Sequence, residues 1–63
     1  MELKGAADYL EGILIGWGLD ESTADWELYK FKKKWRDYTG TFSEWWLKIE
    51  AESIFRRYKG AKK

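Results

Sequence analysis

The sequence predicts an all-α fold, a small three-helix bundle in which residues 1–63 form a single domain. Apolar residues recur at intervals of three and four in each third of the chain, the spacing of one helix face. Glycines separate these thirds, and residues that favour helix starts precede the second and the third. We therefore expect helices at about 2–17, 22–38 and 42–59, followed by a basic tail at 60–63.

The first helix is predicted by an apolar stripe that runs the length of residues 2–17. Its members are Leu3, Ala6, Ala7, Leu10, Ile13, Leu14 and Trp17. At about 100° per residue, these side chains fall on one broad side of a helix. Gly5 and Gly12 cost up to about 1 kcal/mol each relative to alanine, and the stripe outweighs that cost. Gly16 and Gly18 mark the end of this helix.

The second helix has start and stop signals of opposite charge. Acidic residues and residues that can cap a helix N-terminus, such as Asp20, Ser22 and Thr23, stand at its start. Lysines and an arginine crowd its last turns, where they complement the partial negative charge of the helix end. Gly40 then stops the helix. The expected core face consists of Leu28, Phe31, Trp35 and Tyr38.

The third helix is predicted by a capping box and a charge ladder. In the capping box, Thr41 caps the helix and Glu44 reaches back to it. The ladder alternates in sign at intervals of four residues, which only a helix brings together. Its members are Glu44, Lys48, Glu52 and Arg56. The expected core stripe is Leu47, Ala51, Ile54, Phe55 and Tyr58.

An α+β fold, with the N-terminal helix followed by a β-hairpin, is the alternative. Residues 29–36 and 44–52 nearly alternate between apolar and polar, and Thr39 and Gly40 lie between them as turn residues. The capping residues and the charge ladder favour helices instead.

The two halves of the chain carry opposite charge, which the net charge of +1 conceals. Residues 1–29 contain one lysine and seven acidic residues, whereas residues 30–63 contain eleven lysines and arginines and four acidic residues. This pattern predicts either an acidic segment folded against a basic one, or a basic surface that is kept for a partner.

The composition argues against an enzyme. The chain has no histidine and no cysteine, so it lacks the commonest general base, the strongest nucleophile and the usual zinc ligands. It has no glycine-rich phosphate loop, and its serines have no activating neighbour. We expect no catalytic residues, no cofactor, no metal site and no small-molecule substrate.

No segment indicates secretion or membrane insertion. The longest apolar run, residues 13–19, is far shorter than the roughly 20 residues that cross a bilayer. The N-terminus also lacks the basic stretch that precedes the apolar core of a signal peptide. We expect a cytoplasmic protein with no membrane partner.

Aromatic residues exceed what so small a core encloses, with five Trp, four Tyr and three Phe in the chain. On the second helix, Trp26, Tyr29, Lys33 and Arg36 share one side away from the core, and Lys30 flanks them. We call these five residues the basic–aromatic strip. Exposed rings among cations fit an acidic protein partner or unpaired nucleic-acid bases. The alternative is that Trp26 packs on the first helix and the lysines only contact water.

A second apolar face is expected on the third helix, nearly opposite its core stripe. Its members are Phe42, Trp45, Trp46 and Ile49. Monomers rarely expose so large an apolar patch, so we expect an interface with a second copy or another partner. The alternative is that the first turns bend under the bundle and cap its open end.

These features together predict a small regulatory or adaptor protein that acts by binding another macromolecule. The expected partner is a second copy, in a homodimer, or another protein. A nucleic-acid-binding protein that uses the basic second half is the alternative. The sequence pI of about 7.9 argues against it, because dedicated nucleic-acid-binding domains lie above about 9.

Overall fold

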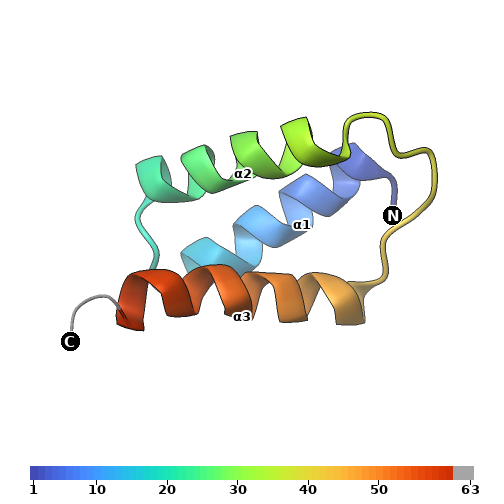
Figure 1. Cartoon of the computed structure of the whole chain (residues 1–63). Helices are drawn as coiled ribbons and strands as arrows, with labels where there is room; N and C mark the ends of the chain where they lie inside the picture. The colour runs from blue at the N-terminus through green and yellow to red at the C-terminus, as the bar shows by residue number, and fades with distance from the viewer. Residues whose placement is uncertain (61–63) are drawn as a thin grey trace.

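The protein consists of three α-helices in a computed structural model that describes the backbone of residues 1–60 and the side chains of residues 1–58 (Figure 1). They are α1 (Leu3–Gly16), α2 (Glu21–Trp35) and α3 (Glu44–Gly60). The described part of the chain contains no strand. The all-α prediction is therefore confirmed, and the helix-plus-hairpin alternative is wrong. Of the expected basic tail, Gly60 belongs to α3, and residues 61–63 lie outside the described residues.

The helix α1 packs directly against both other helices, whereas the backbones of α2 and α3 stay further apart (Figure 1). Small side chains make the close approach possible, since Ala6, Ala7 and Ala24 are almost fully buried. Longer side chains fill the space between α2 and α3, as in the ring contact between Phe31 and Trp46. The molecule measures 38 × 21 × 16 Å.

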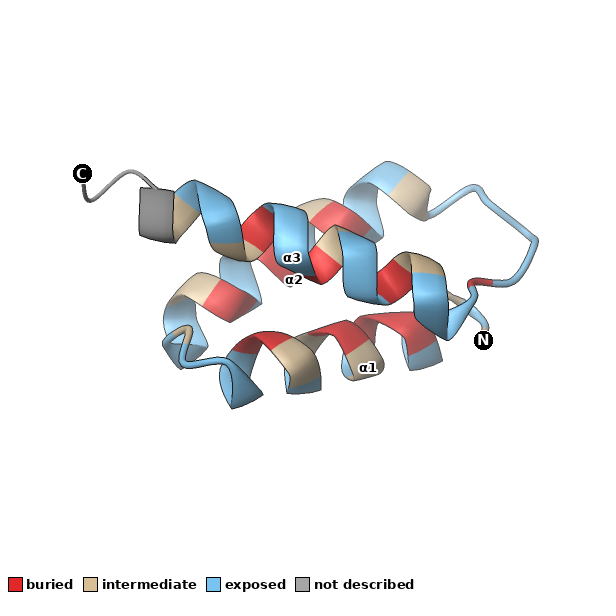
Figure 2. Ribbon diagram, turned by 90° about the horizontal axis from the view of Figure 1, so that it is seen from below, coloured by how far each residue is buried: buried red, intermediate tan, exposed pale blue. Residues whose placement is uncertain are grey.

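The core lies along the inner faces of all three helices (Figure 2). Leu10, Leu14 and Leu47 are its largest fully buried side chains, and burying each one stabilises the fold by about 1.5–3 kcal/mol. The expected core stripes of α1 and α3 lie largely in this interior. Two expected core residues do not, because Trp17 and Tyr38 are both 45% exposed.

The end of α1 is a Schellman motif, in which the two residues after the C-cap residue Trp17 donate to the last carbonyl groups of the helix. Leu19 N donates to Leu14 O at 3.0 Å, and Gly18 N donates to Ile15 O at 3.0 Å. Gly18 has a φ of +106°, a conformation that residues with a Cβ rarely adopt. Gly18 therefore stops α1, and Leu19 turns back to pack against the core.

Asp20 caps the start of α2. Its carboxylate accepts hydrogen bonds from Thr23 N at 3.2 Å and from the hydroxyl groups of Thr23 and Ser22 at 2.7 and 2.8 Å. These bonds, the one from the Thr23 hydroxyl first, lower the pKa of Asp20. The helix ends at Trp35, three residues before the expected boundary. Tyr38 instead lies in the following loop, with its ring edge-on to Trp35.

The loop between α2 and α3 is fixed by backbone pairing with the N-terminus. Met1 N donates to Phe42 O at 2.9 Å, and Phe42 N donates to Met1 O at 2.7 Å. This pairing holds Phe42 outside α3, and its side chain enters the core. The helix therefore begins at Glu44, two residues later than expected.

Ser43, and not Thr41, caps α3. Trp46 N donates to Ser43 Oγ at 3.1 Å, the contact that an N-cap side chain makes. The Thr41 carbonyl instead accepts a hydrogen bond from the Tyr38 hydroxyl at 3.3 Å. The capping box predicted for Thr41 and Glu44 is therefore wrong. Of the predicted charge ladder, Arg56 and Glu52 form an ion pair at 3.6 Å.

Candidate functional site

The basic–aromatic strip occupies the exposed side of α2. Trp26 and Tyr29 are 53% and 55% exposed, and their rings stack with centroids 5.7 Å apart and planes inclined by 18°. Trp26 does not lie among the core residues or the side chains packed against them. The two rings thus form an aromatic surface that is open to solvent.

Each of the two stacked rings has a lysine over its face. Lys30 Nζ lies 5.3 Å from the Trp26 ring centroid, and Lys33 Nζ lies 5.9 Å from the Tyr29 ring centroid. Such cation–π contacts stabilise exposed sites by about 0.5–1 kcal/mol each. They also order side chains that would otherwise move freely in water. Arg36 is the C-cap residue of α2, one turn after Lys33.

A groove runs beside the strip, between α1 and α2. We call it the α1–α2 groove; its volume is about 590 Å³. Its lining residues are Ala7, Asp8, Glu11, Asp25, Leu28, Tyr29, Lys32, Lys33 and Arg36. Three residues of the strip, Tyr29, Lys33 and Arg36, therefore also form part of the groove.

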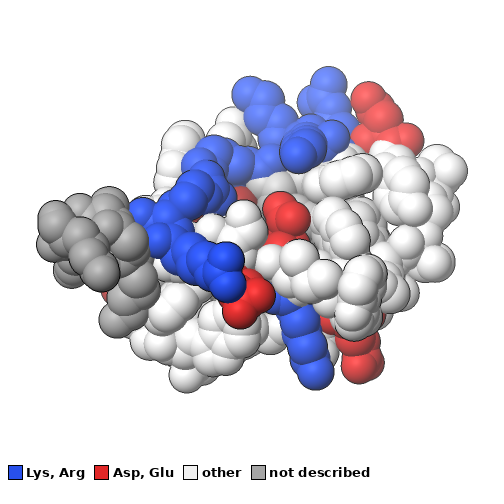
Figure 3. Space-filling model, turned by 60° about the horizontal axis from the view of Figure 1, so that its bottom comes forward, with Lys and Arg blue, Asp and Glu red and all other residues white. Residues whose placement is uncertain are grey.

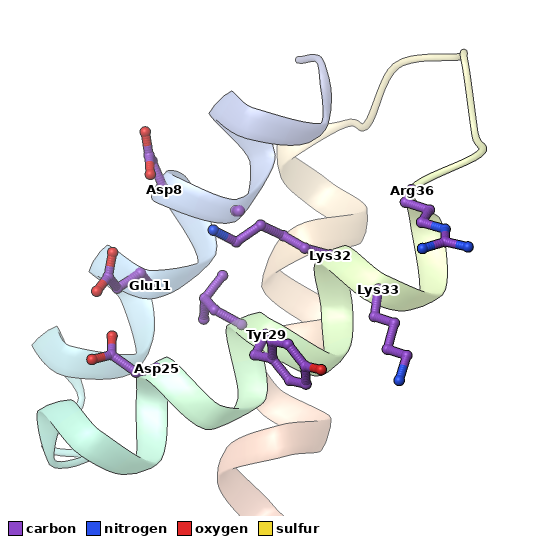
Figure 4. A pocket seen from close by; sticks show the side chains of 9 residues that line it. Asp8, Glu11, Asp25, Tyr29, Lys32, Lys33 and Arg36 are labelled. Atoms are coloured by element: carbon purple, nitrogen blue, oxygen red, sulfur yellow. The ribbon is translucent and has the colours of Figure 1, made fainter.

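The charges of the groove are segregated (Figure 4). The acidic side consists of Asp8 and Glu11 on α1 and Asp25 near the start of α2. Lys33 and Arg36 lie on the opposite side, on the later turns of α2, and Lys32 reaches inward from that helix. Among the described residues, none of the three carboxylates forms an ion pair. The groove therefore presents two oppositely charged sides that are free to meet a partner.

The acidic side of the groove was not predicted from the sequence. The strip could be found within α2 alone, whereas Asp8 and Glu11 come from α1 and reach this site only through the packing of the two helices. The opposite charges of the two halves of the chain were the available signal. They indicated an acidic segment near a basic one without locating the contact.

The burial of the Glu27 carboxylate was also not predicted from the sequence. Glu27 is 3% exposed and shares its face of α2 with Ala24 and Phe31, so helical spacing could have placed it in the core. Arg57 and Lys30 each lie 3.1 Å from its oxygens, and the Tyr58 hydroxyl donates a hydrogen bond to it. This network ties α2 to the C-terminal half of α3.

The environment of Glu27 shifts two pKa values. Burial raises the pKa of Glu27, but the hydrogen bonds from Tyr58 and Lys30 and the positive charge of Arg57 outweigh it. The net result is a lowered pKa for Glu27. The same hydrogen bond raises the pKa of Tyr58, because it is lost when the phenol ionises. Glu27 is thus kept as a charged, fully bonded group.

The apolar face expected on α3 is divided by the fold. Trp45 and Ile49 are 71% and 46% exposed, whereas Phe42 is 7% exposed and Trp46 is half-buried against the core. The expectation that Phe42 lies on an exposed face is wrong, because the pairing with Met1 turns its side chain inward. What remains at the surface is a smaller patch around Trp45.

Phe42 and Trp46 belong to an aromatic cluster at the loop end of the molecule. Phe42 lies 5.6 Å from Trp46 and 5.1 Å from Tyr38 between ring centroids, and Trp46 lies 5.7 Å from Trp35. The Trp35 Nε1 donor is buried there without an acceptor among the described residues. A hollow of about 550 Å³ opens between these rings and Trp45. None of the residues that line this hollow is charged, whereas Lys34 Nζ lies 5.6 Å from the Trp35 ring centroid.

Lysine and arginine side chains gather in a band across one face of the molecule, with acidic side chains interspersed (Figure 3). Within the described residues, no group of three or more carboxylates could hold a metal ion. In the same part of the chain, no helix combines the length and the apolar character that crossing a bilayer requires.

Comparisons of this chain with protein-family models, curated proteins and solved structures find no match.

Proposed function

We propose that this chain is a small non-enzymatic regulatory or adaptor protein that binds another protein through the basic–aromatic strip. The observation that carries this proposal is the exposed, stacked pair of Trp26 and Tyr29, with a lysine over each ring. Tryptophan, tyrosine and arginine are the residues that most often supply binding energy at protein interfaces. Since the chain contains no cysteine, the proposed location is the cytoplasm, where disulfides are rare.

The ordering of these side chains favours binding. A partner that covers Trp26 and Tyr29 immobilises rings that are already stacked, so little conformational entropy is lost on association. Lys33 and Arg36 then attract carboxylates around the apolar contact. The fitting partner is therefore a protein segment that combines acidic and apolar side chains.

Single-stranded nucleic acid is a second candidate, favoured by the same stacked rings and cations. Bases stack on exposed aromatic side chains, and lysines neutralise phosphates. The acidic side of the neighbouring groove counts against it, because Asp8, Glu11 and Asp25 would repel a phosphate backbone that runs across α1 and α2. A protein partner can place charges of both signs, whereas a nucleic-acid backbone cannot.

The test is a fluorescence anisotropy titration of the protein, at low concentration and several salt concentrations, against two labelled probes. One probe is an acidic peptide with leucine at every fourth position, and the other is single-stranded oligo(dT). We expect the peptide to bind. The variants Trp26→Ala and Arg36→Glu should each weaken its binding at least about tenfold, as for hot-spot residues.

The matched control is Lys48→Glu, which reverses an exposed charge on α3 and should leave peptide binding unchanged. Binding of oligo(dT) alone, with an affinity that falls log-linearly with salt, would replace the protein partner by nucleic acid. Failure of both probes to bind, or peptide binding that Trp26→Ala leaves intact, would overturn the proposal.

A further inference from the structure

We infer that a second copy of this chain docks on the α1–α2 groove, related to the first by a two-fold axis. Each copy then places its basic side against the acidic side of the other. This inference rests on the proposed function, because Tyr29, Lys33 and Arg36 belong to both the strip and the groove. It names a partner for that surface and the way in which the partner is oriented.

Charge segregation is the first argument. Asp8, Glu11 and Asp25 occupy one side of the groove, and Lys33 and Arg36 occupy the other (Figure 4). Lys32 reaches from α2 toward the acidic side, where it is the one cation beside three carboxylates among the lining residues. A purely acidic partner would gain from the cations and be repelled by the three carboxylates. A purely basic partner would be attracted by the three carboxylates and repelled by the cations. The favoured occupant carries both signs, arranged as the groove itself arranges them.

Symmetry supplies the second argument. In a two-fold dimer, the same patch meets itself, so a contact from residue i to residue j is repeated from j to i. A patch with opposite charges on its two sides is complementary to its own copy when the axis passes between the sides. The groove has this arrangement. A contact of Glu11 in one copy with Arg36 in the other, for example, would therefore be repeated with the two copies exchanged.

The groove also has an uncharged part that a second copy can contact. Ala7, Leu28 and Tyr29 form its uncharged lining, and the stacked rings of Tyr29 and Trp26 stand at its edge. Ala7 and Leu28 are already buried within one copy, so burial of the exposed rings of Tyr29 and Trp26 would supply the affinity. The surrounding charges, worth little singly at an exposed site, would fix the orientation of the second copy.

The patch around Trp45 lacks such an argument. Trp45 is the most exposed indole, but the hollow beside it is lined by aromatic, threonine and serine side chains without a formal charge. Nothing there selects a second copy over any other apolar partner. We therefore place the dimer contact on the α1–α2 groove and not on the apolar face expected from the sequence.

The experiment is sedimentation equilibrium of the full chain with charge-reversal variants on each side of the groove. The acidic-side variant is Asp8→Lys/Glu11→Lys, and the basic-side variant is Lys33→Glu/Arg36→Glu. We expect the wild type to dimerise and each variant to raise the dimer dissociation constant at least about tenfold, because attraction becomes repulsion. An equimolar mixture of the two variants should associate again as a heterodimer.

The control is Lys48→Glu on α3, outside the groove, which should dimerise like the wild type. Circular dichroism of each variant verifies that its helices are retained. The inference is overturned by a monomeric wild type, by variants that dimerise as tightly as the wild type, or by two folded variants that stay monomeric when mixed. Recovery in the mixture supports it, since misfolded chains would not recover.

The acidic-side variant separates this inference from the proposed function. Its changes lie on α1, outside the basic–aromatic strip, so it should lose self-association and still bind the acidic peptide. Peptide binding by a wild type that stays monomeric would refute the dimer and leave the proposed function standing. Dimerisation through the groove without any peptide binding would support the dimer and refute the proposed function.

Discussion

At the scale of single residues, Glu27 shows how a carboxylate stays charged inside a small helical protein. A buried charge is costly unless it is paired and hydrogen-bonded. Glu27 meets both conditions through Arg57, Lys30 and Tyr58. Both cations are partly exposed and keep part of their hydration. The network therefore pairs the buried carboxylate of Glu27, and Glu27 alone among the two ion pairs loses most of its hydration.

We predict that Glu27→Gln lowers the free energy of unfolding by about 1.5–3 kcal/mol at pH 7, the range for hydrogen bonds to charged groups. Because the pKa of Glu27 is lowered by folding, its charge stabilises the protein above the unfolded pKa of about 4.3. That contribution is lost as the pH falls through the folded pKa. The difference between wild type and variant should thus shrink in acid, which urea unfolding at several pH values measures.

The matched control for this prediction is Glu52→Gln, which breaks the exposed pair with Arg56. Both side chains are more than half exposed, so the expected loss is below about 0.5 kcal/mol at any pH. Equal losses in the two variants, or a loss for Glu27→Gln that does not change with pH, would contradict the role of the buried charge.

At the scale of elements, helix starts are decided by the loop as well as by local residue preferences. Both Thr41 and Ser43 are acceptable caps in the sequence. The backbone pairing between Met1 and Phe42 keeps Phe42 out of the helix, so that only Ser43 stands at the right position.

We therefore predict that Ser43→Ala destabilises the protein by about 1 kcal/mol, the usual cost of losing an N-cap. Thr41→Ala is the matched control and should change the stability by less than about 0.5 kcal/mol, because only its backbone carbonyl is used. Thermal unfolding followed by circular dichroism compares the two. A larger loss of stability for Thr41→Ala than for Ser43→Ala would support the capping box of Thr41 and Glu44 and an earlier start of α3.

The existence of all three helices could be predicted because apolar periodicity is a local signal that many residues share. Leu10, Leu14 and Leu47 lie in the interior as their spacing predicts. Helix ends depend on fewer residues, and here they depend on contacts between distant ones. No sequence pattern around Phe42 indicates that Met1 will pair with it, about forty positions away.

The same reasoning explains which part of the candidate site could be predicted. Trp26, Tyr29 and Lys33 lie together because they occupy one helix face, and helical geometry alone places them. The acidic side of the groove depends on how α1 packs against α2, and on side chains such as Asp8 that look like ordinary solvated charges. That packing became visible only in the structure.

At the scale of the whole molecule, the aromatic residues divide into an enclosed group and an exposed group. Trp35 and Trp46 belong to the aromatic cluster at the loop end. The other three indoles, those of Trp17, Trp26 and Trp45, lie at separate places on the surface and are 45–71% exposed. The excess of rings over core capacity is therefore real, but it is spread over the C-cap of α1, the exposed side of α2 and the first turn of α3, and it does not form one continuous patch.

This division predicts the fluorescence of the protein. In the variant Trp17→Phe/Trp26→Phe/Trp45→Phe, only Trp35 and Trp46 remain, and both are shielded by neighbouring rings. At low protein concentration, its emission maximum should lie at a shorter wavelength than that of the wild type, and acrylamide should quench it less. Circular dichroism should show unchanged helix content. If the two remaining indoles were quenched as readily as those of the wild type, the loop end would be open to water, and the neighbouring rings would not enclose Trp35 and Trp46.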